Sequence, residues 1–214
     1  MKPLVLDYRS ACAALGLALV TTIRAADPAP AAAPAAPPSA AATAGDDTES
    51  QLESLVRHAM PGPEHAVLQR LTGSWEAVTR YWMKPGAEPV EARGTSQRKS
   101  ILGGRFILEE LEGGNLALPF RGVALFGYDA FEKKYTSAWA DTMNTAILTN
   151  LGTYDRTNNV VNFTGQYKDP WTGNRKPQRG ILRFLDANRQ VLELHVTEPG
   201  GQEFKMLEIT YTRK

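Results

Sequence analysis

From Trp75 onward, hydrophobic and polar residues alternate along the chain with a period of two, which is typical of strands that bury one face. The alternation comes in about ten runs, separated by turn residues such as Pro85-Gly86 and Gly113-Gly114. The runs predict strands over residues 75–83, 92–101, 105–112, 120–128, 135–141, 146–154, 160–167, 178–185, 191–197 and 203–213. Since no helical stretch of about ten residues separates them, antiparallel hairpins are expected rather than parallel βαβ units.

The pattern that precedes this β region has the period of a helix. Apolar residues recur at i, i+3, i+4 and i+7, as Leu52, Leu55, Val56 and Ala59. With acidic residues in the first turn, this spacing predicts an amphipathic helix over residues 46–59, which ends before Pro61. A second short helix is expected over residues 64–71. Residues 46–72 therefore form a helical preamble to a β domain over residues 73–214.

About ten short antiparallel strands must protect their edges, because unpaired strand edges aggregate. Closure into an up-and-down barrel removes the edges, and a two-sheet sandwich is the alternative. A barrel of about ten strands is wider than an eight-stranded barrel packed solid, so it has room for a ligand. We expect a mainly β fold: an antiparallel up-and-down barrel of about ten strands with a short N-terminal helical segment.

Residues 1–26 have the pattern of a secretory signal peptide. Lys2 and Arg9 precede an apolar run over residues 11–23, and small residues follow at Ala25 and Ala26. The run is shorter than the about 20 residues that span a membrane. A cleaved signal peptide is therefore expected, with a retained anchor as the alternative, and the protein is expected to be periplasmic or secreted.

Residues 27–45 (DPAPAAAPAAPPSAAATAG) hold five of the 14 prolines and no aromatic residue. This composition predicts an extended, disordered Ala/Pro-rich linker. Cys12 is the single cysteine of the chain and is expected to leave with the signal peptide. A mature chain without cysteine has no thiol nucleophile, no cysteine-based metal site and no disulfide.

The remaining composition is that of an ordinary soluble domain, with 43% hydrophobic and 22% charged residues. The formal net charge of +1 lacks the basic excess of nucleic-acid-binding domains, so no nucleic acid partner is expected. No stable membrane insertion is expected after signal cleavage, and a protein partner is left open.

Several motifs occur in order along residues 61–214: PGPEHAVLQRLTGSWEA, ILGGRFILEE, PFRGVALFGYD, GTYD and the terminal KMLEITYTRK. They resemble the secreted bacterial proteins of domain-of-unknown-function family 1579. The resemblance implies a calycin-like β-barrel, related in architecture to lipocalins, fatty-acid-binding proteins and haem-binding nitrobindins. It implies no established activity.

The calycin resemblance also implies a way to close the barrel. In lipocalins a Gly-x-Trp motif opens the first strand, and an arginine near the end of the last strand covers the tryptophan. Gly73-Ser74-Trp75 and Arg213 hold the matching places in this chain. A guanidinium stacked on an indole contributes about 0.5 to 2 kcal/mol. Trp75 and Arg213 are therefore expected to be structural, and ligand contact is the alternative.

The motifs of known catalytic sites are missing from the sequence: HExxH, Gly-x-Ser-x-Gly and the phosphate-binding glycine motifs. We expect no metal site and no cofactor, except that His195 could hold haem. His195 shares a strand face with Glu193, whereas Leu192 and Leu194 take the other face. If these leucines form the core, His195 points to solvent, and otherwise it points into the barrel. Glu109 and Glu110 also point to opposite faces, so one of them needs an inward partner such as Arg105, Arg121 or Arg183.

The leading hypothesis is a barrel that binds a small, largely apolar molecule, lipid-like or haem-like, in its cavity. The candidate ligand-binding residues are Trp82, Tyr128, Trp139, Asp141, Glu109 and His195. Two alternatives stay open. One is an enzyme that uses cavity carboxylates for acid/base chemistry, and the other is a structural or interaction protein of the cell envelope.

Overall fold

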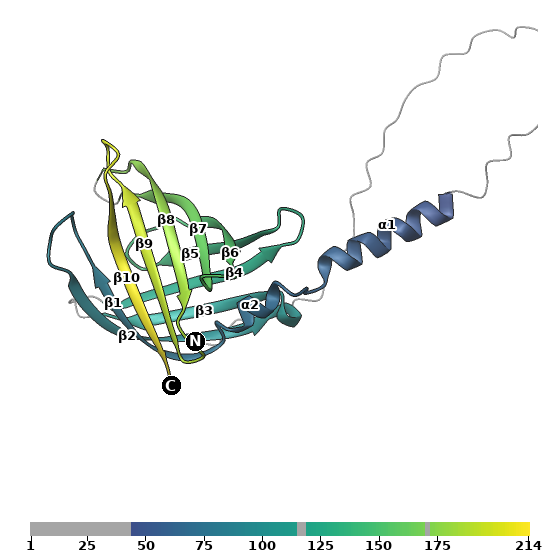
Figure 1. Cartoon of the computed structure of the whole chain (residues 1–214), viewed down its shortest axis with the longest axis horizontal. Coiled ribbons are helices and arrows are strands. Elements are labelled where there is room, and N and C mark those ends of the chain that lie inside the picture. The colour runs from purple at the N-terminus through teal and green to yellow at the C-terminus, as the bar shows by residue number, and fades with distance from the viewer. Residues whose placement is uncertain (1–43, 115–118, 170–171) are drawn as a thin grey trace, which may run out of the picture. The chain divides into compact units, whose positions relative to one another are not determined.

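The computed structural model of the chain describes residues 44–114, 119–169 and 172–214 (Figure 1). The predicted signal peptide, and the predicted linker up to residue 43, lie outside the described residues. The helices are α1 (Ala44–Ala59), α2 (His65–Gln69) and the 3-10 turn η1 (Leu102–Gly104). The strands are β1 (Gly73–Tyr81), β2 (Val90–Ile101), β3 (Phe106–Gly113), β4 (Phe120–Asp129), β5 (Lys134–Asp141), β6 (Leu148–Asp155), β7 (Val160–Lys168), β8 (Arg175–Phe184), β9 (Arg189–Thr197) and β10 (Glu203–Arg213).

The ten strands form one closed antiparallel barrel (Figure 1). Each strand pairs with the next one along the chain, and β1 also pairs with β10, which leaves no free edge. The predicted up-and-down barrel of about ten strands with a short N-terminal helical segment is therefore confirmed, and the sandwich alternative is wrong. The largest difference in bounds is at β8, which begins at Arg175 instead of residue 178. The first three residues of β8 are Arg, Lys and Pro, so no apolar alternation marks its beginning.

The strand register assigns every residue of a strand to the inside or the outside of the barrel. Trp75, Ser96, Leu111 and Gly122 are successive Cα partners across the first four strands, and all four are buried. They mark the inward face, and residues one step away along each strand face outward. The same register places Leu192 and Leu194 inside the barrel and His195 outside it.

One end of the barrel is closed by α2 and the residues that follow it. Val67, Leu68 and Leu71 pack against the inward side chains at that end. We call the adjoining part of the interior the closed half; its other core members include Ile107, Phe126, Tyr135, Val161, Phe163, Leu182 and Phe184. All of these side chains are buried.

Trp75 lies at the closed end, beside Leu71. It is fully buried, and its Nε1 donates to the Leu71 carbonyl at 2.9 Å. The Arg213 guanidinium carbon lies 4.2 Å from the centroid of the indole ring. Gly73 has φ +123°, and a Cβ at this position would lie 2.2 Å from Arg213 Nη1. The Gly-x-Trp spacing is therefore required for the guanidinium to reach the tryptophan.

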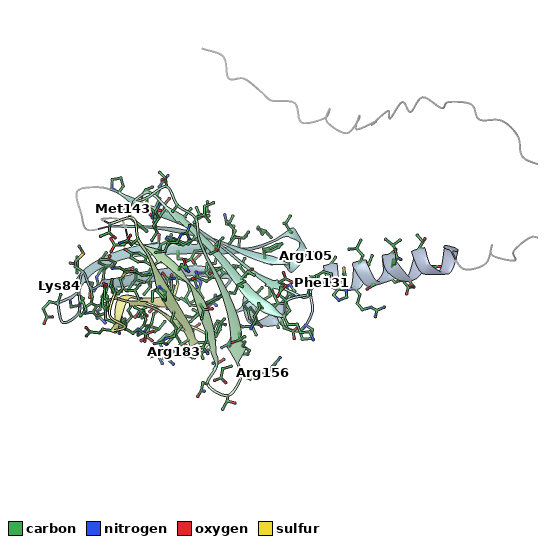
Figure 2. The ribbon with its side chains drawn as sticks, turned by 90° about the horizontal axis from the view of Figure 1, so that it is seen from above. Lys84, Arg105, Phe131, Met143, Arg156 and Arg183 are labelled. Carbon is green, nitrogen blue, oxygen red and sulfur yellow. The ribbon has the colours of Figure 1, made fainter. Side chains whose placement is uncertain are left out.

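The helix α1 contacts the barrel at its C-terminal end. Arg105 Nε donates to the Ala59 carbonyl at 2.7 Å, and the His58 ring stacks on Phe131 with centroids 4.4 Å apart (Figure 2). Its apolar side chains remain largely exposed. Among the described residues, no helix combines the length and the apolar character needed to cross a membrane.

Candidate functional site

The half of the barrel interior away from α2 differs from the closed half in its burial. We call it the open half; its inward residues lie next to the loops that join β1 to β2, β3 to β4, β5 to β6, β7 to β8 and β9 to β10. Many of its aromatic and aliphatic side chains are only partly buried, although Val196 is an exception at 1% exposed. The partly buried side chains include Tyr81, Phe120, Trp139, Leu148, Leu194, Phe204 and Leu207. Because these residues face the inside of a closed barrel, their exposure indicates an interior that solvent reaches from the open end.

Two of the predicted site residues meet in the open half. Trp139 Nε1 donates to Asp141 Oδ2 at 2.7 Å, and the indole stacks near Phe120 with ring centroids 6.3 Å apart. The other Asp141 oxygen accepts the backbone N–H of Met143 at 2.8 Å. The carboxylate therefore fixes both the indole and the loop that follows β5.

A pair of tyrosines spans the open half. Tyr81 of β1 and Tyr167 of β7 are hydrogen-bonded through their side chains, although three strands lie between them in the sheet. Burial raises the pKa of the Tyr167 hydroxyl, and the hydrogen-bonded Tyr81 and the nearby Asp169 and Asp141 raise it further. The open half therefore contains ordered polar groups in an acidic environment.

Three further polar side chains form a chain across neighbouring strands. Gln178 Nε2 donates to Asn150 Oδ1 at 3.1 Å, and Asn150 Nδ2 donates to Ser137 Oγ at 3.2 Å. The intervening β7 permits the first contact through Gly165, where a Cβ would lie 2.1 Å from Asn150 Oδ1. Gln178 is 5% exposed, and its Oε1 has no hydrogen-bond partner among the described residues. We call Ser137, Asn150 and Gln178 the amide chain.

Lys176 is the one basic residue at an inward strand position among the described residues of the open half. Its Nζ lies 2.8 Å from Asp169 Oδ2 and 3.0 Å from Glu198 Oε2. These hydrogen bonds, first to Asp169 and then to Glu198, raise the pKa of the Lys176 ammonium. Its charge is therefore already matched by two carboxylates.

Glu109 and Tyr128 lie in the closed half, away from Trp139 and Asp141. Glu109 Oε1 accepts hydrogen bonds from Arg98 Nη2 at 3.0 Å and Ser96 Oγ at 2.7 Å. The prediction that Arg105, Arg121 or Arg183 would pair with the inward glutamate is wrong. Arg98 of β2 is directly opposite Glu109 of β3 and forms the ion pair instead. Burial, the largest single influence, lowers the pKa of Arg98, but the charges and hydrogen bonds of Glu109 and Tyr211 together raise it above its ordinary value. Tyr128 packs edge-on to Tyr135 at the α2 end.

Trp82 and His195 lie on the outer surface. Lys205 Nζ is 4.9 Å from the Trp82 ring centroid, and Lys205 is opposite His195 on the outward face. His195 Nε2 is 3.7 Å from Glu193 Oε2, a neighbour on the same face. The expectation that His195 could hold haem inside the barrel therefore has no geometric basis, since its leucine neighbours occupy the interior. Across the described residues, no group of three or more His, Cys, Asp and Glu side chains could hold a metal ion.

A groove of about 570 Å³ lies against the outer wall of β4 to β7, where the sequence predicted no site. Its outward lining residues include Phe106, Leu125, Ile147, Leu151, Lys168 and Arg175. This region is called the outer groove below. Its lining also includes Ser137, Leu148, Asn150 and Gly165, whose side chains or Cα atoms take inward positions in the register.

Sequence reasoning missed the amide chain and the tyrosine pair. The signal was present in β8, where the alternation that places Phe184 and Leu182 inside also places Gln178 inside. A polar residue at a position reserved for the core marks either a hydrogen-bonded network or a site.

The comparisons with known proteins agree with this fold. The chain is similar to the crystal structure of Rv2717c from M. tuberculosis, with a TM-score of 0.55 and 16% sequence identity over 72% of this chain and 99% of that chain. At 16% sequence identity, this similarity shows a shared fold and nothing about function. Comparison with curated proteins gives no match. The family model described as "Protein of unknown function (DUF1579)" matches residues 60–213, and this chain therefore belongs to the DUF1579 family.

Proposed function

We propose that the protein binds a small, largely apolar molecule in the open half of the barrel interior. The difference in burial between the two halves carries this proposal. Most inward apolar side chains of the closed half are buried by one another, with Tyr128 and Tyr154 partly buried. In the open half, Trp139, Leu194 and Leu207 all keep contact with solvent. Covering apolar surface contributes about 25 cal/mol per Å². A ligand that covers these three side chains would gain this contribution.

The charges of the open half favour a ligand without a carboxylate. Lys176 is engaged by Asp169 and Glu198, so it offers no unmatched positive charge to an anion. Asp141 adds a further negative charge on the wall that holds Trp139. An anionic head group would have to lose its hydration without gaining a counter-ion, which is costly in a partly buried site.

The amide chain supports an uncharged polar head group instead. An amide side chain has four hydrogen-bonding positions, and Asn150 uses two of them within the chain. The unpaired Oε1 of Gln178 adds a further acceptor next to it. A hydroxyl or carboxamide both donates and accepts, so it can bind to this chain. The ligand class that we propose is an apolar body that carries an alcohol or an amide.

The pattern of residues 1–26 supports a periplasmic or extracellular place for this binding. Apolar molecules are sparingly soluble in the aqueous periplasm and outside the cell. A barrel that covers such a molecule would act as its carrier or its store.

Titration with N-phenyl-1-naphthylamine, a neutral fluorophore whose emission rises in apolar surroundings, tests the proposal. We expect saturable binding to the mature chain, with Trp139→Ala weakening it at least tenfold. Trp82→Ala is the matched control, because this indole lies outside the barrel, and it should leave the affinity unchanged. Decanamide and 1-decanol should displace the fluorophore at lower concentration than decanoate. The absence of saturable binding, or equal losses in the two tryptophan variants, would overturn the proposal.

A further inference from the structure

None of the described residues covers the apolar stripe of α1, which is formed by Leu52, Leu55 and Val56. Leu52, Leu55 and Val56 are 60%, 61% and 52% exposed. Glu49 and Glu53 follow the edge of this stripe at helical spacing. A helix of 16 residues is only marginally stable in water unless it packs its apolar face against something. The stripe therefore needs a partner surface.

The outer groove is a second uncovered apolar surface. Leu125, Ile147 and Leu151 line it and are 38%, 71% and 52% exposed. Between them the groove is lined by small residues, among them Ala138, Thr149 and Thr164. Exposed apolar surface that is gathered in one hollow marks an interaction site more often than scattered apolar residues do.

Two positive charges stand together at one end of the outer groove. Lys168 and Arg175 are direct Cα partners across β7 and β8 and both line the groove. Like charges directly opposite each other destabilise a sheet. In the part of the chain that the structure describes, no carboxylate lies within ion-pair distance of either residue, whereas Arg179 on the same strand pairs with Glu203 at 2.8 Å. The arrangement therefore favours an acidic partner.

We propose that α1 of one copy of the chain docks in the outer groove of a second copy. Leu52, Leu55 and Val56 would cover the apolar lining, and Glu49 and Glu53 would face Lys168 and Arg175. The helix is about 24 Å long at about 1.5 Å per residue, close to the about 26 to 30 Å of an eight- or nine-residue strand. The described part of each chain offers this stripe and this groove to the other copy, so a reciprocal exchange closes as a two-fold dimer.

The contacts at the end of α1 favour a second copy over the helix's own groove. Ala59 and His58 are held by Arg105 and Phe131 while the apolar stripe remains exposed (Figure 2). A second copy can cover the stripe without breaking these contacts. Two helix-in-groove contacts per dimer also double the buried area, and a standard stable interface needs about 800 Å² from each partner.

Sedimentation equilibrium of the mature chain between 1 and 100 µM tests this inference. We expect a monomer–dimer equilibrium that Leu55→Asp weakens at least tenfold. Leu55 is exposed and lies outside the barrel, so the variant should keep the melting temperature of the barrel. Leu185→Asp is the matched control: this leucine is 52% exposed and does not line the groove, and its variant should dimerise normally.

A charge exchange identifies the surfaces. Lys168→Glu with Arg175→Glu should weaken the dimer, and adding Glu49→Lys with Glu53→Lys should restore it. A monomer at 100 µM overturns the inference, whether or not hydrogen exchange finds α1 protected by its own barrel. A dimer that Leu55→Asp and the charge exchange leave unchanged also overturns it. Binding of N-phenyl-1-naphthylamine in the open half is independent of all these outcomes.

Discussion

The two halves of the barrel interior are built by the same ten strands and differ in what their inward side chains do. In β8, Phe184 and Leu182 are buried in the closed half, whereas Lys176 and Gln178 stand in the open half. The closed half pairs its buried charges, Arg98 with Glu109, although Arg98 Nε has no hydrogen-bond partner among the described residues. The open half leaves Gln178 Oε1 without a partner and its aromatic residues partly exposed. The closed half therefore contains most of the tightly packed core, and the open half is where the proposed ligand would bind.

The largest expected effect is the loss of the buried ion pair. Arg98→Met should lower the free energy of unfolding by about 3 to 5 kcal/mol, because it leaves the Glu109 carboxylate buried without its counter-charge. Both side chains of the pair are at most 2% exposed, and Arg98 also donates to Gln190 at 2.9 Å. Urea unfolding monitored by tryptophan fluorescence measures the change.

The matched control is Lys99→Met, one residue further along β2. Lys99 faces outward, and its Nζ lies 3.9 Å from Glu110 Oε2 with both side chains exposed. An exposed pair of this kind contributes about 0 to 1 kcal/mol. If Arg98→Met cost no more than Lys99→Met, the closed half would not be the stabilising half of the barrel.

The barrel itself was predictable from the sequence because its signals are local. Alternation with a period of two, together with turn residues at regular spacing, located all ten strands. The stacking of Arg213 on Trp75 was also recognisable from the motif Gly73-Ser74-Trp75. Residue 73 must be a glycine because the Arg213 guanidinium lies where a Cβ would be. Local requirements of this kind restrict which residue types can occur, so they can be recognised in the sequence.

The site was less predictable because it depends on which face of each strand is inside. The alternation around His195 admitted both directions, and only the pairing with β8 and β10 decides between them. The pairing of Glu109 with Arg98 likewise depends on the register between β2 and β3, and the sequence of one strand alone does not determine that register. The tyrosine pair joins residues on strands that are not neighbours, so it follows from barrel closure rather than from local sequence.

Trp75 and Trp139, the two tryptophans at inward positions among the described residues, test the comparison further. Trp75→Ala should lower the free energy of unfolding by about 3 to 5 kcal/mol, because it opens a cavity around a fully buried side chain. Trp139→Ala should lower it by about 1 to 2 kcal/mol, because its indole is only partly buried and less packing is lost. Urea unfolding of both variants measures the difference. Equal losses would mean that the open half is packed as tightly as the closed half.

Alkaline unfolding tests whether the closed half excludes water. Burial, with smaller contributions from Glu64 and Tyr128, raises the pKa of Tyr135 to about 12. An unfolded tyrosine has a pKa of about 10. The stability that this difference provides is complete below pH 10 and is lost as the pH rises from 10 to about 12.

Tyr135→Phe should therefore remove part of that alkaline loss, while costing about 1 kcal/mol at pH 8 through the missing hydrogen bond to the Glu64 carbonyl. Urea unfolding at pH 8, 10 and 11.5 measures both effects. An alkaline loss that is as steep in the variant as in the wild type would indicate that Tyr135 ionises freely in the folded protein. The closed half would then be open to water at the α2 end.

The smallest effect is expected at His195, where the comparison between inside and outside is most direct. The ring lies on the outer face with Nε2 unpaired among the described residues, so His195→Leu removes no hydrogen bond of that atom. Its unfolding free energy should change by less than about 0.5 to 1 kcal/mol, and binding of N-phenyl-1-naphthylamine should stay within twofold. Gln178→Leu, on the inward face, should instead weaken displacement by decanamide. Its unfolding free energy should change by no more than about 1 kcal/mol, because the variant removes the unpaired Oε1 but also the hydrogen bond from Nε2 to Asn150 Oδ1. Fluorescence displacement on the two variants separates them. If His195→Leu were the variant that lost binding, the ligand would lie on the outer wall and the open half would have no role in it.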